Sequence, residues 1–311
     1  MTESTKTIVD NEIIKDFIIT NLDYIVLEKI NEGHMGLPIF RCIDDSGGLR
    51  VIKIGVGAQV KQEIDDNLHG YTSIVAAGAE MIVPENIKTI DTPWGRAIDL
   101  PDLGQDFTKS STTESKTRKN YEVLDRIFLD VIKKTRVHDR ESHLKGVVEA
   151  VSQVQKWSSQ LIDSGIATAD LNEIIVAIDP HVISGTVASV MILDFTPDNI
   201  FINNGSIKFI DPWRQKNYLG TPLPALAQFI TLAESVYKIP GFNEEALNYS
   251  ELVQNIGKEL ELNPQAVAAQ VYLGRALQFS LSSYVRISSN PEFSRKYAKL
   301  SRENIEKITH L

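Results

Sequence analysis

The sequence contains a single cysteine, Cys42, among its 311 residues. One thiol excludes an internal disulfide and a zinc site built from several cysteines. No apolar run reaches the roughly 18 residues that suggest a membrane-spanning helix. The opening segment, MTESTKTIVDNEIIKD, lacks the basic and apolar stretches of a secretion signal. We therefore expect a cytoplasmic protein with no membrane partner.

Basic residues are also few relative to acidic ones. The chain has 32 Lys and Arg against 41 Asp and Glu, a formal net charge of −9. Proteins that bind nucleic acids by neutralising phosphates need clustered Lys and Arg, so we expect no nucleic-acid partner. The same acidity is compatible with a cationic small substrate. A hydrophobic content of 42% is that of an ordinary globular protein, and this length allows one large domain or two lobes.

The first hundred residues have the pattern of a small, mostly antiparallel sheet with a helix. Residues 1–23 are expected to form an N-terminal helix and linker. Three segments rich in Val and Ile are predicted strands: YIVLEKI (24–30), LPIFRCI (37–43) and LRVIKIG (49–55). Residues 59–75 change to a helical pattern, and MIVPENIKTI and GRAIDL are predicted to return to strand.

The remainder of the chain is predicted to be mostly helical. The polar stretch TKSSTTESKTRKN (108–120) is low in apolar residues and is predicted to be a mobile loop or boundary. From Tyr121 onward apolar residues recur at helical spacing, and Asn263 followed by Pro264 is the pattern of a helix start. We predict an α+β protein with a β-rich N-terminal lobe, 1–103, and an α-rich C-terminal lobe, 104–311.

One segment of the helical half, LDFTPDNIFINNGSIKFIDPW (193–213), predicts two short strands around an Asn204-Gly205 turn. Asp194 and Asp211 lie at the ends of these strands, with Asn199 between them. Two carboxylates and an amide oxygen form a set of hard ligands that suits Mg²⁺, bound by Asn199 and Asp211. Asp194 would accept a hydroxyl proton, as phosphoryl transfer requires. The alternative is an ordinary hairpin with acidic residues at its exposed ends.

DFTPDN resembles the D-x-x-x-x-N catalytic loop of the protein-kinase-like superfamily. It is similar to the D-L-H-P-G-N form found in aminoglycoside and choline phosphotransferases, and IDP around Asp211 stands where that family has its metal-binding aspartate. The resemblance implies a bilobal kinase-like fold, a nucleotide partner (ATP or GTP), Mg²⁺ and a small-molecule acceptor. It implies Asp194 as the base or orienting group, and Asn199 and Asp211 as metal ligands.

The same resemblance assigns roles in the N-terminal lobe. Lys53 would contact the α- and β-phosphates, Glu63 would pair with it, and Gly33 and Gly36 would lie over the phosphates. In AIDLPDLGQDF, the segment that links the lobes, the backbone near the purine edge would come from Leu100, Asp102 and Leu103. Each has a plainer alternative: a lysine extending its charge from a strand end, a solvated helix-face glutamate and an ordinary hairpin loop.

The sequence also departs from the family pattern. Ile192-Leu193 stand where the family has His-Gly, and the loop carries Thr196 and Asp198 where His and Gly are common. Asp198 would bind substrate or cap the turn. The leading hypothesis is a small-molecule kinase acting on a hydroxyl group. The alternatives are a nucleotide-binding pseudokinase and a protein kinase, although no A-P-E-like segment follows Asp211. Acceptor identity and oligomeric state cannot be read from the sequence.

Overall fold

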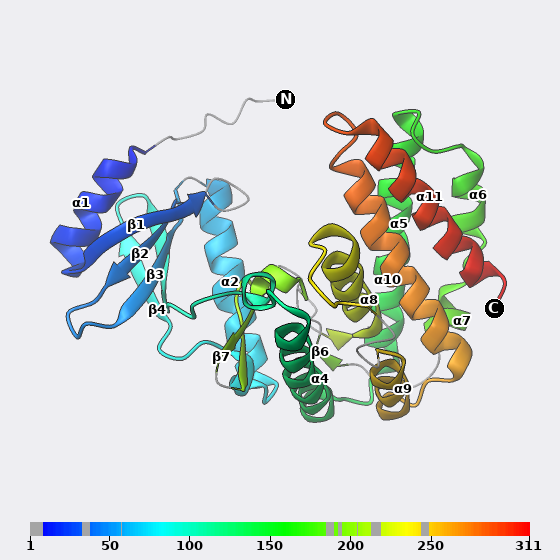
Figure 1. The fold of residues 1–311 in the computed structure, drawn as a ribbon, viewed down its shortest axis with the longest axis horizontal. Coiled ribbons are helices and arrows are strands. Elements are labelled where there is room, and N and C mark those ends of the chain that lie inside the picture. The colour runs from blue at the N-terminus through cyan, green and yellow to red at the C-terminus, as the bar shows by residue number, and fades with distance from the viewer. Residues whose placement is uncertain are drawn as a thin grey trace. The chain divides into compact units, whose positions relative to one another are not determined.

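The computed structural model describes residues 9–32, 38–56, 58–184, 190–191, 195–203, 205–212, 219–243 and 249–311 (Figure 1). The chain divides into two compact units. The first comprises Met1–Ala76, Glu80–Gly104 and Lys208–Arg214, and the second comprises Ala77–Ala79, Gln105–Ile207 and Gln215–Leu311. Residues 208–214 therefore belong to the β-rich unit although they follow about half of the helical one in sequence.

The first unit is built on a five-stranded antiparallel sheet with strand order β1-β2-β3-β5-β4. Its strands are β1 Ile25–Glu32, β2 Pro38–Ile43, β3 Leu49–Ile54, β4 Lys88–Thr92 and β5 Gly95–Pro101. The helices are α1 Asn11–Leu22, α2 Ala58–Ala76 and the short 3₁₀ helix η1 Glu80–Ile82. Asp10 caps α1 by accepting a hydrogen bond from the backbone N–H of Glu12 at 3.0 Å.

The two faces of this sheet pack against different helices. Ile14 and Ile18 of α1 are fully buried against a face that includes Cys42 and Ile52. Because side chains alternate along a strand, Lys53 and its β5 neighbour Ile98 point to the opposite face. Helix α2 packs against β5. Lys53 therefore shares a sheet face with the apolar residues beneath α2.

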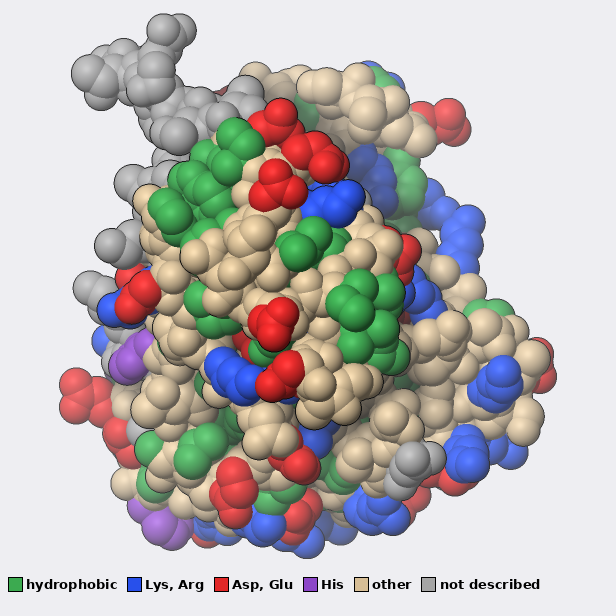
Figure 2. All heavy atoms as spheres, turned by 90° about the vertical axis from the view of Figure 1, so that its left-hand side faces the viewer, with side chains coloured by type: hydrophobic (Ala, Val, Ile, Leu, Met, Phe, Trp, Pro, Cys, Tyr) green, Lys and Arg blue, Asp and Glu red, His purple; other side chains and the backbone are tan. Residues whose placement is uncertain are grey.

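Apolar side chains also gather on the surface of this unit around α1 and β1 (Figure 2). The exposed large apolar residues of these two elements are Ile13, Ile19, Ile25, Leu27 and Ile30. Strand β1 stands at one end of the strand order, so this surface combines a sheet edge with apolar side chains.

The second unit is mainly helical. Its helices are α3 Phe107–Ser110, α4 Glu114–Thr135, α5 Arg140–Asp163, α6 Asp170–Val176, α7 Pro180–Ser184, α8 Leu223–Thr231, the π-helix η3 Leu232–Val236, α9 Tyr249–Glu259, α10 Pro264–Tyr284 and α11 Pro291–Thr309. Helix α10 packs against α5, α8 and α11, and its buried face forms the centre of this unit. Among the described residues, no helix has the length and apolarity needed to cross a membrane.

Two small sheets accompany these helices. Strands β6 Val190–Met191 and β9 Leu219–Gly220 pair antiparallel, and β7 Ile200–Asn203 pairs with β8 Ser206–Phe209. The 3₁₀ helix η2, Pro197–Asn199, leads directly into β7. The chain passes from the second unit into the first between Ile207 and Lys208.

The α+β class, with a β-rich N-terminal part and a helical C-terminal part, is confirmed. So is the helix start at Asn263, whose side chain accepts a hydrogen bond from the backbone N–H of Ala266 at 2.8 Å. The strand prediction for Met81–Val83 is wrong, because Glu80–Ile82 forms a 3₁₀ turn and the strand begins only at Lys88.

The loop prediction for residues 108–120 is also wrong, because α3 and α4 occupy most of that stretch. Low apolar content misled the prediction. Asp106 and Thr113 cap the two helices through the backbone N–H groups of Lys109 and Lys116. Lys, Arg and Glu are good helix formers, and the buried contacts of this stretch are made by small hydroxyl side chains, Ser111 and Thr117.

Candidate functional site

Lys53 occupies a central position in the sheet of the first unit. It lies on β3, opposite Ile39 of β2 and Ile98 of β5, and is only 6% exposed. Its Nζ donates a hydrogen bond to Oδ1 of Asp211, 158 residues later in sequence and within the same unit. A buried ammonium needs an opposite charge nearby, and Asp211 supplies it. The structure thus brings together two of the predicted site residues.

Asp211 itself has an unusual backbone conformation. Its φ is +52°, in the left-handed region, which few residues besides glycine adopt, asparagine and aspartate more often than the others. Such a conformation costs of order 1–3 kcal/mol and persists only where the surroundings hold it in place. The Lys53 ion pair is one of the contacts that hold it. Backbone strain of this kind concentrates at functional sites.

Helix α2 supplies the other contact at this position. A Cβ atom on Gly70 would lie 2.7 Å from Cγ and 2.8 Å from Cβ of Pro212, so only glycine lets the helix approach the chain this closely. Tyr71, the next residue, is 4% exposed. Burial, and then the Asp211 carboxylate, raise the pKa of Tyr71 well above its usual value. The backbone of Asp211 comes near the Tyr71 hydroxyl, but no described residue makes a hydrogen bond of good geometry with it.

Sequence reasoning missed both Gly70 and Tyr71. The available signal was a glycine inside the helical pattern QVKQEIDDNLHGYTSIV, which costs about 1 kcal/mol relative to alanine and suggests a packing reason. The pattern could not say which segment approaches the helix, because Pro212 is distant in sequence. This contact connects α2 to the segment that carries Asp211.

In the second unit, the residues around the predicted catalytic loop are well packed. Phe195 is 3% exposed, and its ring centroid lies 4.5 Å from that of Phe128 and 5.0 Å from that of Phe229. The backbone N–H of Asn199 donates to the carbonyl of Thr196 at 3.0 Å. Asp198 is exposed. Asp194, immediately before Phe195, lies outside the described residues, so its catalytic role stays a prediction.

Several other predicted site residues are described only in part or not at all. Gly33 and Gly36 lie outside the described residues, and Glu63 lies in α2 with its side chain not described. Asn199 belongs to the second unit and Asp211 to the first, so a shared metal site stays a prediction. Within the described ranges, no group of three or more His, Cys, Asp or Glu side chains could hold a metal.

The linker after β5 has a defined set of backbone groups. The N–H of Asp102 donates to the carbonyl of Leu49 at 2.9 Å, and Leu100 is paired with Val51. Hydrogen-bonded pairs alternate along an antiparallel ladder, so the N–H and C=O of Leu100 face β3. The carbonyl of Pro101 points away from β3. Leu100 lies two residues from Ile98, the neighbour of Lys53, so its side chain is on the same face of the sheet as Lys53. This side chain is 2% exposed.

The side chain of Asp102 is already engaged in contacts within the first unit. Its Oδ2 accepts a hydrogen bond from Nε of Arg41 at 2.6 Å, and its Oδ1 accepts one from the backbone N–H of Gly104 at 2.9 Å. These contacts shape the linker. In the described part of the chain, the Asp102 carboxylate therefore has a structural role.

A buried polar network, which sequence reasoning missed, anchors the start of the linker. Asp99 is fully buried and accepts hydrogen bonds from Nε of Arg50 at 2.7 Å and from the hydroxyl of Tyr24 at 2.9 Å. Burial and the Asp99 carboxylate raise the pKa of Tyr24 to about 12. Arg50 also donates to the carbonyl of Asn86 at 2.8 Å. The network connects β3, β5 and the short segment between α1 and β1, and so fixes the residue that precedes Leu100.

Solved structures with a similar fold exist although the sequence itself has no match. No protein-family model and no curated protein matches the sequence. Aminoglycoside 2′-phosphotransferase-IIIa, solved with GDP, matches with a TM-score of 0.58 and 11% identity over 96% of this chain and 99% of that one. A Ralstonia eutropha protein provisionally assigned as an aminoglycoside phosphotransferase matches with a TM-score of 0.58 and 11% identity, over 96% and 98% of the two chains.

Choline kinase from Cryptosporidium parvum matches with a TM-score of 0.55 and 14% identity, over 97% of this chain and 96% of that one. The chain therefore has the protein-kinase-like fold of aminoglycoside phosphotransferases and choline kinase, as the DFTPDN and IDP motifs predict.

Proposed function

We propose that this protein is a small-molecule kinase that transfers the γ-phosphate of ATP or GTP to a hydroxyl group of a small acceptor. The observation that carries the proposal is the ion pair between buried Lys53 and strained Asp211, in a fold shared with phosphotransferases. The two residues are the ones that the sequence resemblance selected independently. An incidental ion pair would not require a buried lysine at the centre of a sheet.

In this proposal Lys53 binds the phosphates of the nucleotide. A cation in a poorly hydrated position interacts with a phosphate oxygen more strongly than a cation in water does. Its strand places it rigidly, so little reorganisation is needed when the nucleotide binds. Asp211, with 38% of its side chain exposed, pairs with Lys53 while remaining open to ligand.

Asp194 would orient the acceptor hydroxyl and accept its proton. Asn199 and Asp211 would hold Mg²⁺, since carboxylate and amide oxygens are the hard ligands that this ion prefers. Bound Mg²⁺ would supply neutralisation of the charge on the phosphates. Gly70 acts indirectly, because it lets α2 approach Pro212 closely, and Tyr71 lies beside Asp211.

The linker would bind the purine through its backbone. The carbonyl of Pro101 and the backbone of Leu103 are candidates for these contacts, because the N–H and C=O of Leu100 are directed to β3 and the N–H of Asp102 donates to Leu49. The side chain of Leu100 would line the apolar floor of the purine site. The GDP bound in the similar phosphotransferase keeps GTP, as well as ATP, among the candidate donors.

A nucleotide-binding pseudokinase with a regulatory or scaffold role is the second candidate. Ile192 and Leu193 stand where active members of the resembled family have His-Gly, and this departure favours it. Retention of Asp194, Asn199 and Asp211 opposes it. Magnesium-dependent nucleotide turnover by the purified protein distinguishes the two candidates, because a pseudokinase would bind nucleotide without consuming it.

A thermal-shift screen with ATP and GTP, each with and without Mg²⁺, tests the first step. A ligand that binds the folded state raises the melting temperature, by an amount that grows with the ratio of its free concentration to its Kd. We expect a magnesium-dependent rise for one of these nucleotides, and a much smaller rise for Lys53→Met. An equal rise for the wild-type protein and the Lys53→Met variant would contradict the assigned role of Lys53.

Single substitutions then test the chemistry on a panel of hydroxylated and aminated metabolites. Asp211→Ala and Asp194→Ala are each expected to abolish phosphate transfer while the protein stays folded, because catalysis of this reaction depends on positioning and charge stabilisation. Circular dichroism and thermal unfolding provide the folding control. Near wild-type turnover by either variant would remove the role assigned to that residue.

A further inference from the structure

The linker after β5 directs its backbone groups alternately to two edges. The N–H of Asp102 donates to the carbonyl of Leu49 at 2.9 Å, and Leu100 is paired with Val51 of β3. Bonded pairs alternate with unbonded ones along an antiparallel ladder. Pro101 lies between the two bonded positions, so its backbone is directed to the opposite edge of β5, away from β3.

That opposite edge is covered by β4 only as far as Asp99. Strand β4 pairs with β5 up to Lys88, which lies opposite Asp99. Pro101 is therefore the first outward-facing position beyond the end of β4. It is half-buried, and no described residue donates a hydrogen bond to its carbonyl. Because proline has no N–H, this position offers an acceptor and no donor.

Hydrogen-bond donors are scarce along the rest of the linker. The N–H groups of Leu100 and Asp102 are directed to β3, and the N–H of Gly104 donates to Oδ1 of Asp102 at 2.9 Å. Within 100–104, the one N–H without a partner in the described part of the chain is that of Leu103. The linker thus offers the Pro101 carbonyl as an acceptor, followed two residues later by the Leu103 N–H as a donor.

The side chain of Asp102 adds no further acceptor for a base. A free carboxylate beside the linker could accept the ring N–H and the amino group of guanine. The Asp102 side chain is only 9% exposed, and its two oxygens already accept from Nε of Arg41 and from the N–H of Gly104. Arg41 is held in turn by Glu28. Recognition of a base by the linker therefore depends on its backbone.

The order of these backbone groups matches one purine and not the other. Adenine has an amino donor at its 6-position beside the ring acceptor N1, whereas guanine has an oxygen acceptor at that position beside a ring N–H. We propose that the linker selects adenine, so that ATP rather than GTP is the phosphate donor, and that Pro101 sets this selection. The amino group would donate to the Pro101 carbonyl, and N1 would accept from the Leu103 N–H. The proposal rests on the proposed nucleotide site and makes it specific.

Guanine in the same place would bring its oxygen against the Pro101 carbonyl, and neither acceptor would have a donor. An N–H at position 101 would supply one, since both backbone groups of a strand residue face the same edge. Proline removes that N–H. The residue at 101 therefore decides whether a 6-oxo purine is tolerated.

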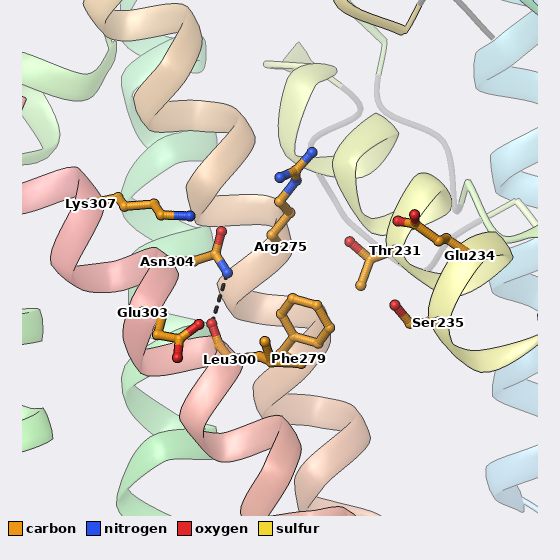
Figure 3. A pocket seen from close by; sticks show the side chains of 9 residues that line it. All are labelled: Thr231, Glu234, Ser235, Arg275, Phe279, Leu300, Glu303, Asn304 and Lys307. Carbon is orange, nitrogen blue, oxygen red and sulfur yellow. Dashed lines mark hydrogen bonds between the residues drawn. The ribbon is translucent and has the colours of Figure 1, made fainter. Parts of the chain in front are cut away.

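The second unit has a cavity of about 190 Å³ lined by η3, α10 and α11, which offers no comparable site (Figure 3). Asn304 donates through Nδ2 to the carbonyl of Leu300 at 2.8 Å. Its Oδ1 has no donor among the described residues, but it is buried, so a molecule in the cavity cannot reach it. The ammonium of Lys307 lies 5.3 Å from the ring centre of Tyr272. We expect one nucleotide per chain.

Titration calorimetry with Mg²⁺ and four nucleotides tests the selection on the full chain. ATP and the triphosphate of 2,6-diaminopurine riboside carry a 6-amino group, and ITP and GTP carry a 6-oxo group. Each 6-amino nucleotide is expected to bind at least about tenfold more tightly than its 6-oxo counterpart, because a buried acceptor without a donor is costly. GTP and the diaminopurine nucleotide share the 2-amino group, so their comparison isolates the 6-position.

The possible failures are distinguishable. Equal affinity for 6-amino and 6-oxo nucleotides would overturn the selection and leave the nucleotide site in place. Tight binding of GTP with weak binding of ITP would show recognition through the 2-amino group, and would also overturn it. Binding of none of the four would remove the proposed nucleotide site, and this proposal with it.

The Pro101→Ala variant tests the residue itself. It keeps the carbonyl and adds an N–H on the same edge, so the ratio of ITP affinity to ATP affinity should rise at least about threefold, the effect of one neutral hydrogen bond. A proline that merely ends strand pairing would leave this ratio unchanged, and that result would overturn the role of Pro101. Pro291→Ala, at the exposed start of α11, is the matched control and should not change the ratio. Thermal unfolding checks that both variants are folded.

Discussion

Replacing Gly70 with alanine gives a sensitive test of the contact between α2 and the segment that carries Asp211. In an unobstructed helix, Gly→Ala raises the free energy of unfolding by about 1 kcal/mol, because alanine restricts the unfolded chain and favours the helix. At Gly70 the new methyl group would meet Cγ and Cβ of Pro212 at 2.7 and 2.8 Å. The contact therefore decides the sign of the change in stability.

Carbon atoms at optimal contact are about 3.5–4.0 Å apart, so the methyl group would be roughly 1 Å too close. The ring atoms of Pro212 cannot rotate out of the way, and the backbone of the Asp211–Pro212 segment must shift instead. Overpacking of this kind costs about 1–3 kcal/mol, which offsets or exceeds the gain in helix propensity. We expect the Gly70→Ala variant to be between about 0 and 2 kcal/mol less stable than wild type.

The functional effect should be larger than the effect on stability. A shift of about 1 Å in a positioning group lowers catalytic rates roughly 10²-fold, and here the shift would separate Asp211 from Lys53. Urea unfolding and kcat/KM for phosphate transfer measure the two effects. Thr72→Ala, at an exposed position of the same helix, is the matched control and should change stability by less than about 0.5 kcal/mol. A Gly70→Ala variant about 1 kcal/mol more stable, with unchanged activity, would refute the contact.

Three further predictions concern single side chains. Lys53→Met should weaken nucleotide affinity at least about tenfold in titration calorimetry, because a charge-assisted contact to phosphate is lost. Wild-type affinity in this variant would contradict the role assigned to Lys53. Burial, and then Asp99, raise the pKa of the fully buried Cys42 to about 12. A thiol reagent at about pH 8 should therefore label Cys42 only in denaturant, and fast labelling of the native protein would contradict this prediction. Burial, and then Glu251, raise the pKa of Asp125, so ionisation of this carboxyl above about pH 4 costs the folded state free energy that Asp125→Asn does not lose. Urea unfolding at neutral pH should show the variant about 1 kcal/mol more stable than wild type, and a difference that does not narrow toward about pH 3 would contradict this prediction.

Much of the fold follows from local patterns in the sequence. Alternating Val and Ile predict β2 and β3 to within about one residue, and Asn263-Pro264 predicts the start of α10. The stretch 108–120 was mispredicted because its two helices depend on caps at Asp106 and Thr113, and it contains most of the short α3 but only the first seven residues of α4. Low hydrophobicity is a poor guide where the segment is stabilised by capping and by small buried hydroxyl groups.

The candidate site was predictable in part. A lysine in an apolar strand and an aspartate after an apolar strand are visible in the sequence, and the family resemblance selected both as site residues. It gave Glu63 as the partner of Lys53, and the ion pair with Asp211, 158 residues away in sequence, was not predicted. The contacts of Gly70 and Tyr71 with the Asp211–Pro212 segment have no such motif. Asn304 looks like any helix residue, and only tertiary packing shows that its oxygen is buried without a donor.

Transfer of labelled γ-phosphate to a small molecule is the most direct test of the proposed activity. The purified protein would be incubated with Mg²⁺, γ-labelled ATP or GTP and a mixture of hydroxylated metabolites, and the products separated by chromatography. Wild type should yield a labelled small molecule, and Asp211→Ala should yield none. A wild-type reaction that consumes no nucleotide, or equal product from the variant, would contradict the assignment of Lys53 and Asp211 to a phosphate-transfer site.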